Sequence, residues 1–315
     1  MIKINYGYKV FVDRLVLNFI KENDDKILPS FIKEEFQAIK KLFFTRKNLK
    51  EVKSLLSKKN DSDRKLEEKL FEYIKSIISE KDFEIKNGKN FLFSKNIIKK
   101  FNVQETIKVI EGFYGIKVKN INIYLLPSYL DKKNVGASAS SSIDSIYIYI
   151  LNKKSKDYIS NLKINLIHEL AHLHEKERVL EKIKNIFRPR EKDFYKSWFL
   201  LKKEFGNGYY ITREILANLF SNWDFSYLGK KEGIYNLQKY NPKQFTDKDE
   251  LLNGKFNKKD NYSFHRVYYL YAFYCKDFFW EYVNNKKKID EEFFIKIADV
   301  LTEKRSKNII SSTIN

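Results

Sequence analysis

The spacing of apolar residues predicts helices over most of the chain. In the helical segments, apolar side chains recur at intervals that place them on one face of an α-helix. Glycine and proline number only 10 and 4 among 315 residues, which favours helices over a fold with many turns. We expect Gly112 or Gly115 to end the helix that begins at residue 94. The expected helices are 30–44, 64–78, 94–112, 155–187, 262–283 and 293–301.

The apolar pattern changes to alternation between residues 116 and 151. Segments 116–125 and 143–150 alternate in the way that is typical of strands. Between them, residues 136–142 are all small. This small-residue segment is either a flexible connection or an edge strand whose free backbone groups can pair with an extended peptide. Strands enclosed by helices predict an α+β fold that is mainly helical with a small sheet.

One short segment of the expected helix 155–187 carries metal-binding chemistry. His168, Glu169 and His172 form the pattern H-E-x-x-H. Positions i and i+4 of a helix lie about 40° apart, so the two imidazoles can point at one ion. Zinc accepts such nitrogen ligands and makes a bound water acidic near neutral pH, and the neighbouring carboxylate of Glu169 can take its proton. The pattern therefore predicts a zinc hydrolase with two histidine ligands and Glu169 as general base.

A chance match on a core helix is the alternative explanation of this motif. The chain has only four histidines, and the residues around the motif are mostly apolar. Burying three ionisable side chains in such a helix is strongly unfavourable unless a partner compensates them. A metal ion is that partner, so we favour the zinc site.

A catalytic zinc site needs a third protein ligand. The metzincin pattern requires a histidine ten residues after His168, where this chain has Arg178. We expect Glu214 to be the ligand, because Ala217 allows its helix to approach the metal helix and Asn218 can orient a ligand by hydrogen bonding. The competing carboxylates are Glu175, Glu177, Glu181 and Glu204.

The two remaining histidines have other expected roles. His174 lies about 120° from His168, on the side opposite Glu169, so we expect it to support a ligand or to face solvent. His265, in the aromatic segment 262–283, is our candidate for the donor that stabilises the tetrahedral oxyanion. A buried structural role is the alternative for His265. The competing donors are Tyr209, Tyr210, Tyr268 and Tyr269.

Residues 168–172 and 214–218 together resemble the gluzincin group of zinc metallopeptidases. The second segment, Glu-Ile-Leu-Ala-Asn, also resembles the E-x-x-A-N segment of the ImmA/IrrE-type metallopeptidases. The resemblance covers roughly residues 116–225. It implies His168, His172 and Glu214 as zinc ligands and Glu169 as general base.

The resemblance also implies a zincin-like fold, with an edge strand above the site for the substrate. We therefore expect an N-terminal helical region, 1–115, and a zincin-like catalytic domain, 116–315. Two features depart from the compact members of the group. The spacing of 42 residues between the second histidine and Glu214 is longer, and no helix-turn-helix domain is evident. A role in regulating a repressor therefore does not follow.

Charge and cysteine content limit the partners and the compartment. The net charge of +20 comes from lysines and arginines spread along the whole chain, and only 9 of these 61 residues are arginine. Such a distribution predicts a solvated basic surface rather than specific nucleic-acid recognition.

A single cysteine, Cys275, excludes an intrachain disulfide and fits a reducing compartment. Without a signal peptide or a long apolar run, we expect a cytoplasmic protein that does not enter membranes.

These observations predict an intracellular zinc-dependent metallopeptidase that acts on a peptide or protein. One alternative is a zinc hydrolase that cleaves another kind of amide. The other is a catalytically silent, zinc-stabilised binding protein whose basic surface holds an anionic partner.

Overall fold

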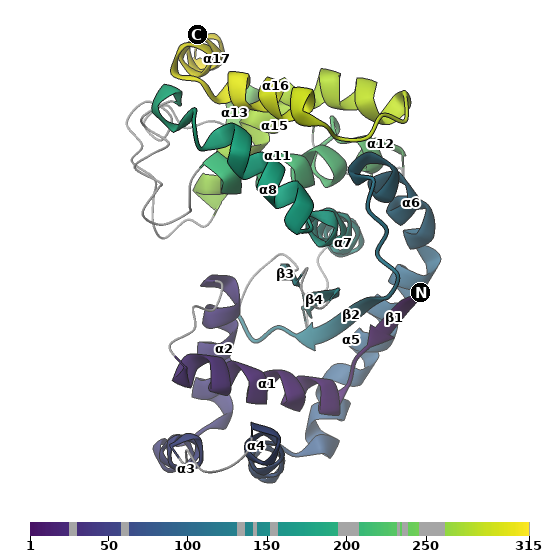
Figure 1. Ribbon diagram of the computed structural model, residues 1–315. Coiled ribbons are helices and arrows are strands. Elements are labelled where there is room, and N and C mark those ends of the chain that lie inside the picture. The colour runs from purple at the N-terminus through teal and green to yellow at the C-terminus, as the bar shows by residue number, and fades with distance from the viewer. Residues whose placement is uncertain are drawn as a thin grey trace. The chain divides into compact units, whose positions relative to one another are not determined.

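Helices make up most of the chain that the computed structural model describes (Figure 1). The other regular element is a four-stranded mixed sheet, which agrees with the predicted α+β class. The chain forms two compact units, each assembled from segments that are separate in the sequence. The expected regions 1–115 and 116–315 remain predictions. The described residues are 1–24, 30–57, 63–130, 136–140, 144–151, 157–194, 208–231, 234, 239–245 and 262–314.

The first unit contains most of the sheet. It consists of Met1–Phe101, Asn120–Ser138 and Ser145–Leu162. Its helices are α1 (Tyr8–Asn23), α2 (Ser30–Phe43), α3 (Arg46–Leu56), α4 (Asp63–Ile77) and α5 (Glu80–Lys100). The strand order is β1 (Ile2–Asn5), β2 (Ile121–Pro127), β4 (Ser145–Ile150) and β3 (Gly136–Ser140). Strands β1, β2 and β4 are parallel to one another. Every side chain of β4 is buried, as expected for a parallel strand that is covered on both faces.

Both predicted strands are present, but their bounds differ from the prediction, since β2 extends to Pro127 and β4 begins at Ser145. Strand β2 begins at Ile121 rather than at residue 116. Strand β1 lies in a region that was expected to be mainly helical, and its residues pair with those of β2, beginning with Ile2 opposite Ile121. The described part of the small-residue segment, Gly136–Ser140, is a strand at the edge of the sheet, so the edge-strand interpretation agrees with the structure. Residues 141 and 142 lie outside the described residues.

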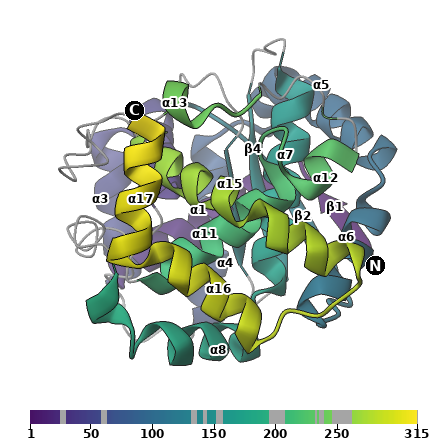
Figure 2. The same ribbon diagram turned by 90° about the horizontal axis from the view of Figure 1, so that it is seen from above.

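The second unit has an aromatic core. It consists of Asn102–Lys119, Ala139–Asp144 and Lys163–Asn315. Phe113 contacts Phe220, Phe279 and Phe293, with ring centroids 5.4, 5.1 and 5.3 Å away. These rings join four helices that Figure 2 shows in one view: α6, α11, α15 and α16. The helices of this unit are α6 (Val103–Tyr114), α8 (Glu177–Phe187), α11 (Gly208–Ser221), α12 (Tyr227–Lys231), α13 (Pro242–Phe245), α15 (Tyr262–Asn284), α16 (Glu291–Leu301) and α17 (Glu303–Ile314).

Two segments that were predicted as single helices are divided in the structure. The expected helix 155–187 forms α7 (Tyr158–His174) and α8, so α7 ends directly after the metal-binding motif. The expected helix 94–112 covers the end of α5 and most of α6, which continues to Tyr114. Gly115 ends α6, as predicted for one of two glycines. Its N–H makes the last helical hydrogen bond, to the Glu111 carbonyl at 2.8 Å, and its left-handed φ of 66° then turns the chain out of the helix.

Candidate metal centre

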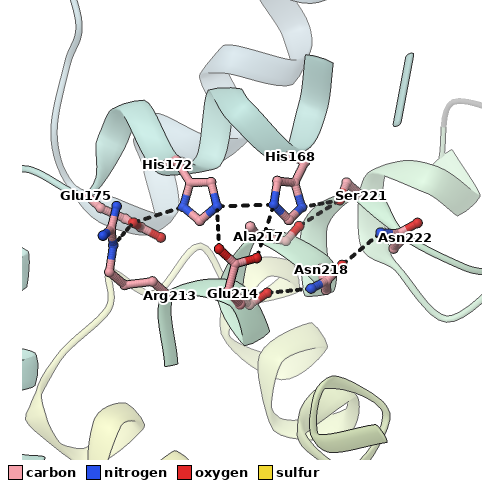
Figure 3. A network of polar contacts seen from close by, with 9 residues as sticks. All are labelled: His168, His172, Glu175, Arg213, Glu214, Ala217, Asn218, Ser221 and Asn222. Atoms are coloured by element: carbon pink, nitrogen blue, oxygen red, sulfur yellow. Dashed lines mark hydrogen bonds and ion pairs between the residues drawn. The ribbon is translucent and has the colours of Figure 1, made fainter. Parts of the chain in front are cut away.

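Three ligand-type side chains of the second unit, from α7 and α11, lie close together (Figure 3). His168 and His172 lie one turn apart on α7, and their Nε2 atoms are 3.1 Å from each other. Glu214 of α11 closes the group, because its Oε2 lies 3.4 Å from Nε2 of His168 and its Oε1 lies 3.5 Å from Nε2 of His172. We call these three residues the metal group. They are the sequence-predicted ligands, and the structure brings all three to one place.

The metal group has the dimensions of a tetrahedral site. Zinc binds histidine nitrogens at about 2.0–2.1 Å, so neighbouring ligands of a tetrahedron lie about 3.3–3.4 Å apart. The observed separations of 3.1, 3.4 and 3.5 Å are close to this value. The group can therefore hold a metal ion, with Nε2 as the coordinating atom of both histidines.

The contacts behind the histidines also direct Nε2 toward a cation. Nδ1 of His172 lies 3.0 Å from Oε2 of Glu175, and Nδ1 of His168 lies 3.5 Å from Oγ of Ser221. The Ser221 hydroxyl donates to the Ala217 carbonyl at 2.8 Å, so its oxygen is available as an acceptor. Each ring can therefore carry its hydrogen on Nδ1 and leave a lone pair on Nε2. Two such lone pairs facing a carboxylate can accept a cation between them.

The electrostatics of the metal group lead to the same conclusion. Burial alone would raise the pKa of Glu214, but His172 and His168 hold it well below its usual value. Burial alone would lower the pKa of His172, but the carboxylates of Glu175 and Glu214 raise it well above its usual value. Glu214 is therefore an anion, and the pocket of side chains around it favours a cation.

Glu169 lies beside the metal group without belonging to it. Its side chain is buried, and burial raises the pKa of its carboxyl, while His168 and His172 act in the opposite direction. The carboxylate accepts a hydrogen bond from the main-chain N–H of Ala139 in β3. A carboxylate with a raised pKa is suited to accept a proton near neutral pH.

Glu175 has a role that the sequence analysis missed, since it was considered there only as a competing ligand. It is fully buried, and its Oε2 accepts from Arg213 Nε at 2.6 Å as well as from the ring of His172. The only signal in the sequence was its spacing of three residues from His172, which is close to one helical turn. Arg213 directly precedes Glu214, but its contact with Glu175 joins positions 38 residues apart.

Other residues singled out in the sequence lie elsewhere. Asn218 donates to the main-chain carbonyl of Glu214 at 2.7 Å, so it supports α11 and not the carboxylate. His174 is fully buried, which excludes a solvent-facing role. Its Nδ1 lies 2.7 Å from the Leu170 carbonyl, its ring stacks on Tyr114, and burial lowers its pKa.

The remaining competing ligands and the candidate oxyanion donors do not join the metal group in the described part of the chain. Glu177 is exposed, and Glu181 forms an exposed ion pair with Lys184 on α8. His265 belongs to α15, but its side chain is outside the described part of the chain, as are those of Tyr209 and Tyr210. The other competing donors, Tyr268 and Tyr269, also lie on α15. The assignment of an oxyanion donor therefore stays a prediction. Glu204 lies outside the described residues.

No protein-family model matches the chain, and comparison with curated proteins and with solved structures finds no significant match. The case for the metal group therefore depends on its own geometry. Within the residues that the structure describes, no helix combines the length and apolar character needed to cross a membrane.

Proposed function

We propose that this protein is a zinc-dependent metallopeptidase of the gluzincin type with a zincin-like core. The observation that carries the proposal is the meeting of His168, His172 and Glu214 beside the buried carboxylate of Glu169. Two histidines, one carboxylate and an adjacent general base are the side chains of a zinc peptidase site. The proposed ligands are the metal group, and the proposed metal is zinc.

The chain's own residues supply the remaining chemistry. Zinc bound at the metal group would supply Lewis acidity, which polarises a carbonyl and makes water acidic near neutral pH. Glu169 takes the proton of the attacking water and then gives it to the leaving amine. Its hydrogen bond from Ala139 helps to hold the carboxylate in place for this transfer. His265 remains our proposed oxyanion donor.

Strand β3 supports a peptide as the substrate. It is the last strand in the order of the sheet, so one of its edges has no strand neighbour in the described chain. Its residues are glycine, alanine and serine, which leave room for an extended peptide to pair with the backbone. Ala139, in the same strand, contacts Glu169. We propose that the substrate adds to β3 and so brings a peptide bond to the general base.

Metal content and proteolysis test this proposal together. Protein purified without chelators is expected to contain about one zinc per chain and to cleave an unstructured protein. A zinc chelator should abolish cleavage, and added zinc should restore it. Absence of zinc, with no uptake on addition, would contradict the proposal. Zinc without turnover would favour the silent binding protein, and turnover confined to non-peptide amides would favour the other hydrolase.

The charge of the protein leads to a separate prediction. If the charge of +20 reflects a solvated surface, binding to duplex DNA should be weak and should disappear by about 0.2 M salt. The described lysines agree with this view where they pair with surface acids, such as Lys40 with Glu22 and Lys307 with Glu303. Salt titration of binding to two unrelated duplexes measures it. Salt-resistant, sequence-selective binding would contradict it and favour the binding-protein alternative.

A further inference from the structure

An ion pair between the buried Glu175 and the partly exposed Arg213 lies behind the metal group and joins the end of α7 to α11. We propose that Glu175 and Arg213 are positioning residues that set the metal affinity of the site by fixing His172 and Glu214, although neither residue belongs to the metal group. This inference rests on the proposed metal-binding function. It goes beyond that function because it assigns the affinity to two residues that no ligand pattern contains.

Glu175 is brought behind His172 by the end of α7. The helix ends at His174, and the N–H of Glu175 donates to the carbonyl of His172 at 3.2 Å, which tightens the last turn. The carboxylate then lies 3.0 Å from Nδ1 of His172. A hydrogen held on Nδ1 commits the ring to the tautomer whose Nε2 can bind a metal. The same contact prevents the ring from turning away from the metal group.

Arg213 compensates the negative charge of the buried Glu175 carboxylate. Glu175 is fully buried, and an uncompensated charge at such a position is strongly unfavourable. Arg213 Nε donates to Oε2 at 2.6 Å, so one oxygen holds both the arginine and the histidine. The other oxygen, Oε1, is buried and has no hydrogen-bond partner among the described residues. The contacts of this carboxylate are therefore concentrated on the metal side.

The ion pair also acts on the third ligand. Arg213 precedes Glu214 on α11, whereas Glu175 follows directly after α7. Their contact therefore ties the backbone beside Glu214 to the backbone beside His172. One carboxylate thus fixes the orientation of one ligand and the distance between the two ligand-bearing helices.

His168 provides an internal comparison. Its Nδ1 lies 3.5 Å from the Ser221 hydroxyl, which is at the limit of a hydrogen bond and involves no charge. His172 instead has a charged acceptor at 3.0 Å. If the ion pair positions the site, removing Glu175 should weaken metal binding far more than removing the Ser221 hydroxyl.

The test measures zinc affinity by competition with a chelator of known affinity, at one pH, for the full chain. Glu175→Ala is expected to weaken binding about 10–100-fold, the range seen when a group that hydrogen-bonds to a metal ligand is removed. Arg213→Ala should weaken it too, and the double variant should lose less than the product of the two single losses. The exposed controls Glu177→Ala and Arg178→Ala should bind as wild type, and Ser221→Ala should weaken binding far less than Glu175→Ala does.

Two further measurements separate positioning from general destabilisation. Cobalt(II) bound in place of zinc reports ligand geometry by its visible spectrum, and Glu175→Gln should alter that spectrum because an amide lacks the charge that holds the ring. Thermal unfolding of the metal-free variants identifies those that fail to fold. If Glu175→Ala does not fold, Glu175→Gln replaces it in the affinity measurement. Wild-type zinc affinity and spectrum in a folded Glu175 variant would overturn the inference alone. A wild-type chain without zinc would overturn it together with the proposed function.

Discussion

Glu169→Gln is expected to keep zinc and the fold while losing about 10²–10⁴-fold in peptide hydrolysis, the usual contribution of a general base. The amide has the shape of the carboxylate but cannot accept a proton from water. It can still accept the hydrogen bond from Ala139, so the local structure should not change. Glu169 is also absent from the three residues that form the metal group, so zinc content should be unaffected.

This prediction is checked by steady-state hydrolysis of an unstructured protein, with zinc measured on the same samples. Glu177→Gln is the matched control, because it makes the same substitution at an exposed position on α8. Full activity in Glu169→Gln would exclude Glu169 as the base. Loss of zinc in this variant would instead mean that the carboxylate helps to bind the metal.

The ligands could be predicted from the sequence because most of the motif is local. His168 and His172 lie on one helix, and helical geometry alone places them on one face. Glu214 required a further argument about helix packing, and Ala217 supplied it. That side chain is fully buried, and α11 packs chiefly against α15. The close approach of α11 to α7 stays a prediction. The metal group is the part of the site where short-range rules and the structure agree.

Glu175 and Arg213 could not be predicted, because their contact depends on where α7 ends. No glycine or proline marks the break between α7 and α8, so the apolar pattern predicted one continuous helix. The break between α5 and α6 was also missed, but the sequence does contain a signal for it. Asn102 accepts from the Glu105 N–H at 3.2 Å, and an asparagine three residues before a glutamate is a helix-start pattern.

Strand β1 is the part of the sheet that could not be predicted from the sequence. Its four residues are too few to establish an alternating pattern, and its partner strand lies more than a hundred residues away. Its pairing with β2, from Ile2 opposite Ile121 to Asn5 opposite Tyr124, defines it as a strand. Strand β4 could be predicted because its alternation of isoleucine and tyrosine is visible within one short segment.

Replacing a ligand is expected to remove the metal. Zinc content should fall from about one per chain to nearly none in His172→Ala, because two remaining ligands cannot close a catalytic site. His168→Ala should behave in the same way. Glu214→Ala should weaken binding strongly as well, since it removes the only carboxylate of the metal group and leaves two neutral imidazoles to attract the cation.

The Glu214 result is the more informative one, because this ligand was predicted from weaker evidence. Elemental analysis after dialysis measures zinc, and Glu181→Ala is the control, since its carboxylate is exposed and pairs with Lys184 on α8. Zinc retained by Glu214→Ala would exclude the gluzincin ligand set even if both histidines were essential. In a zinc-bound structure, a Glu214 oxygen should lie about 2.0–2.2 Å from the metal. That distance requires only a small approach of α11 to α7, since the carboxylate already lies 3.4 and 3.5 Å from the two histidine nitrogens.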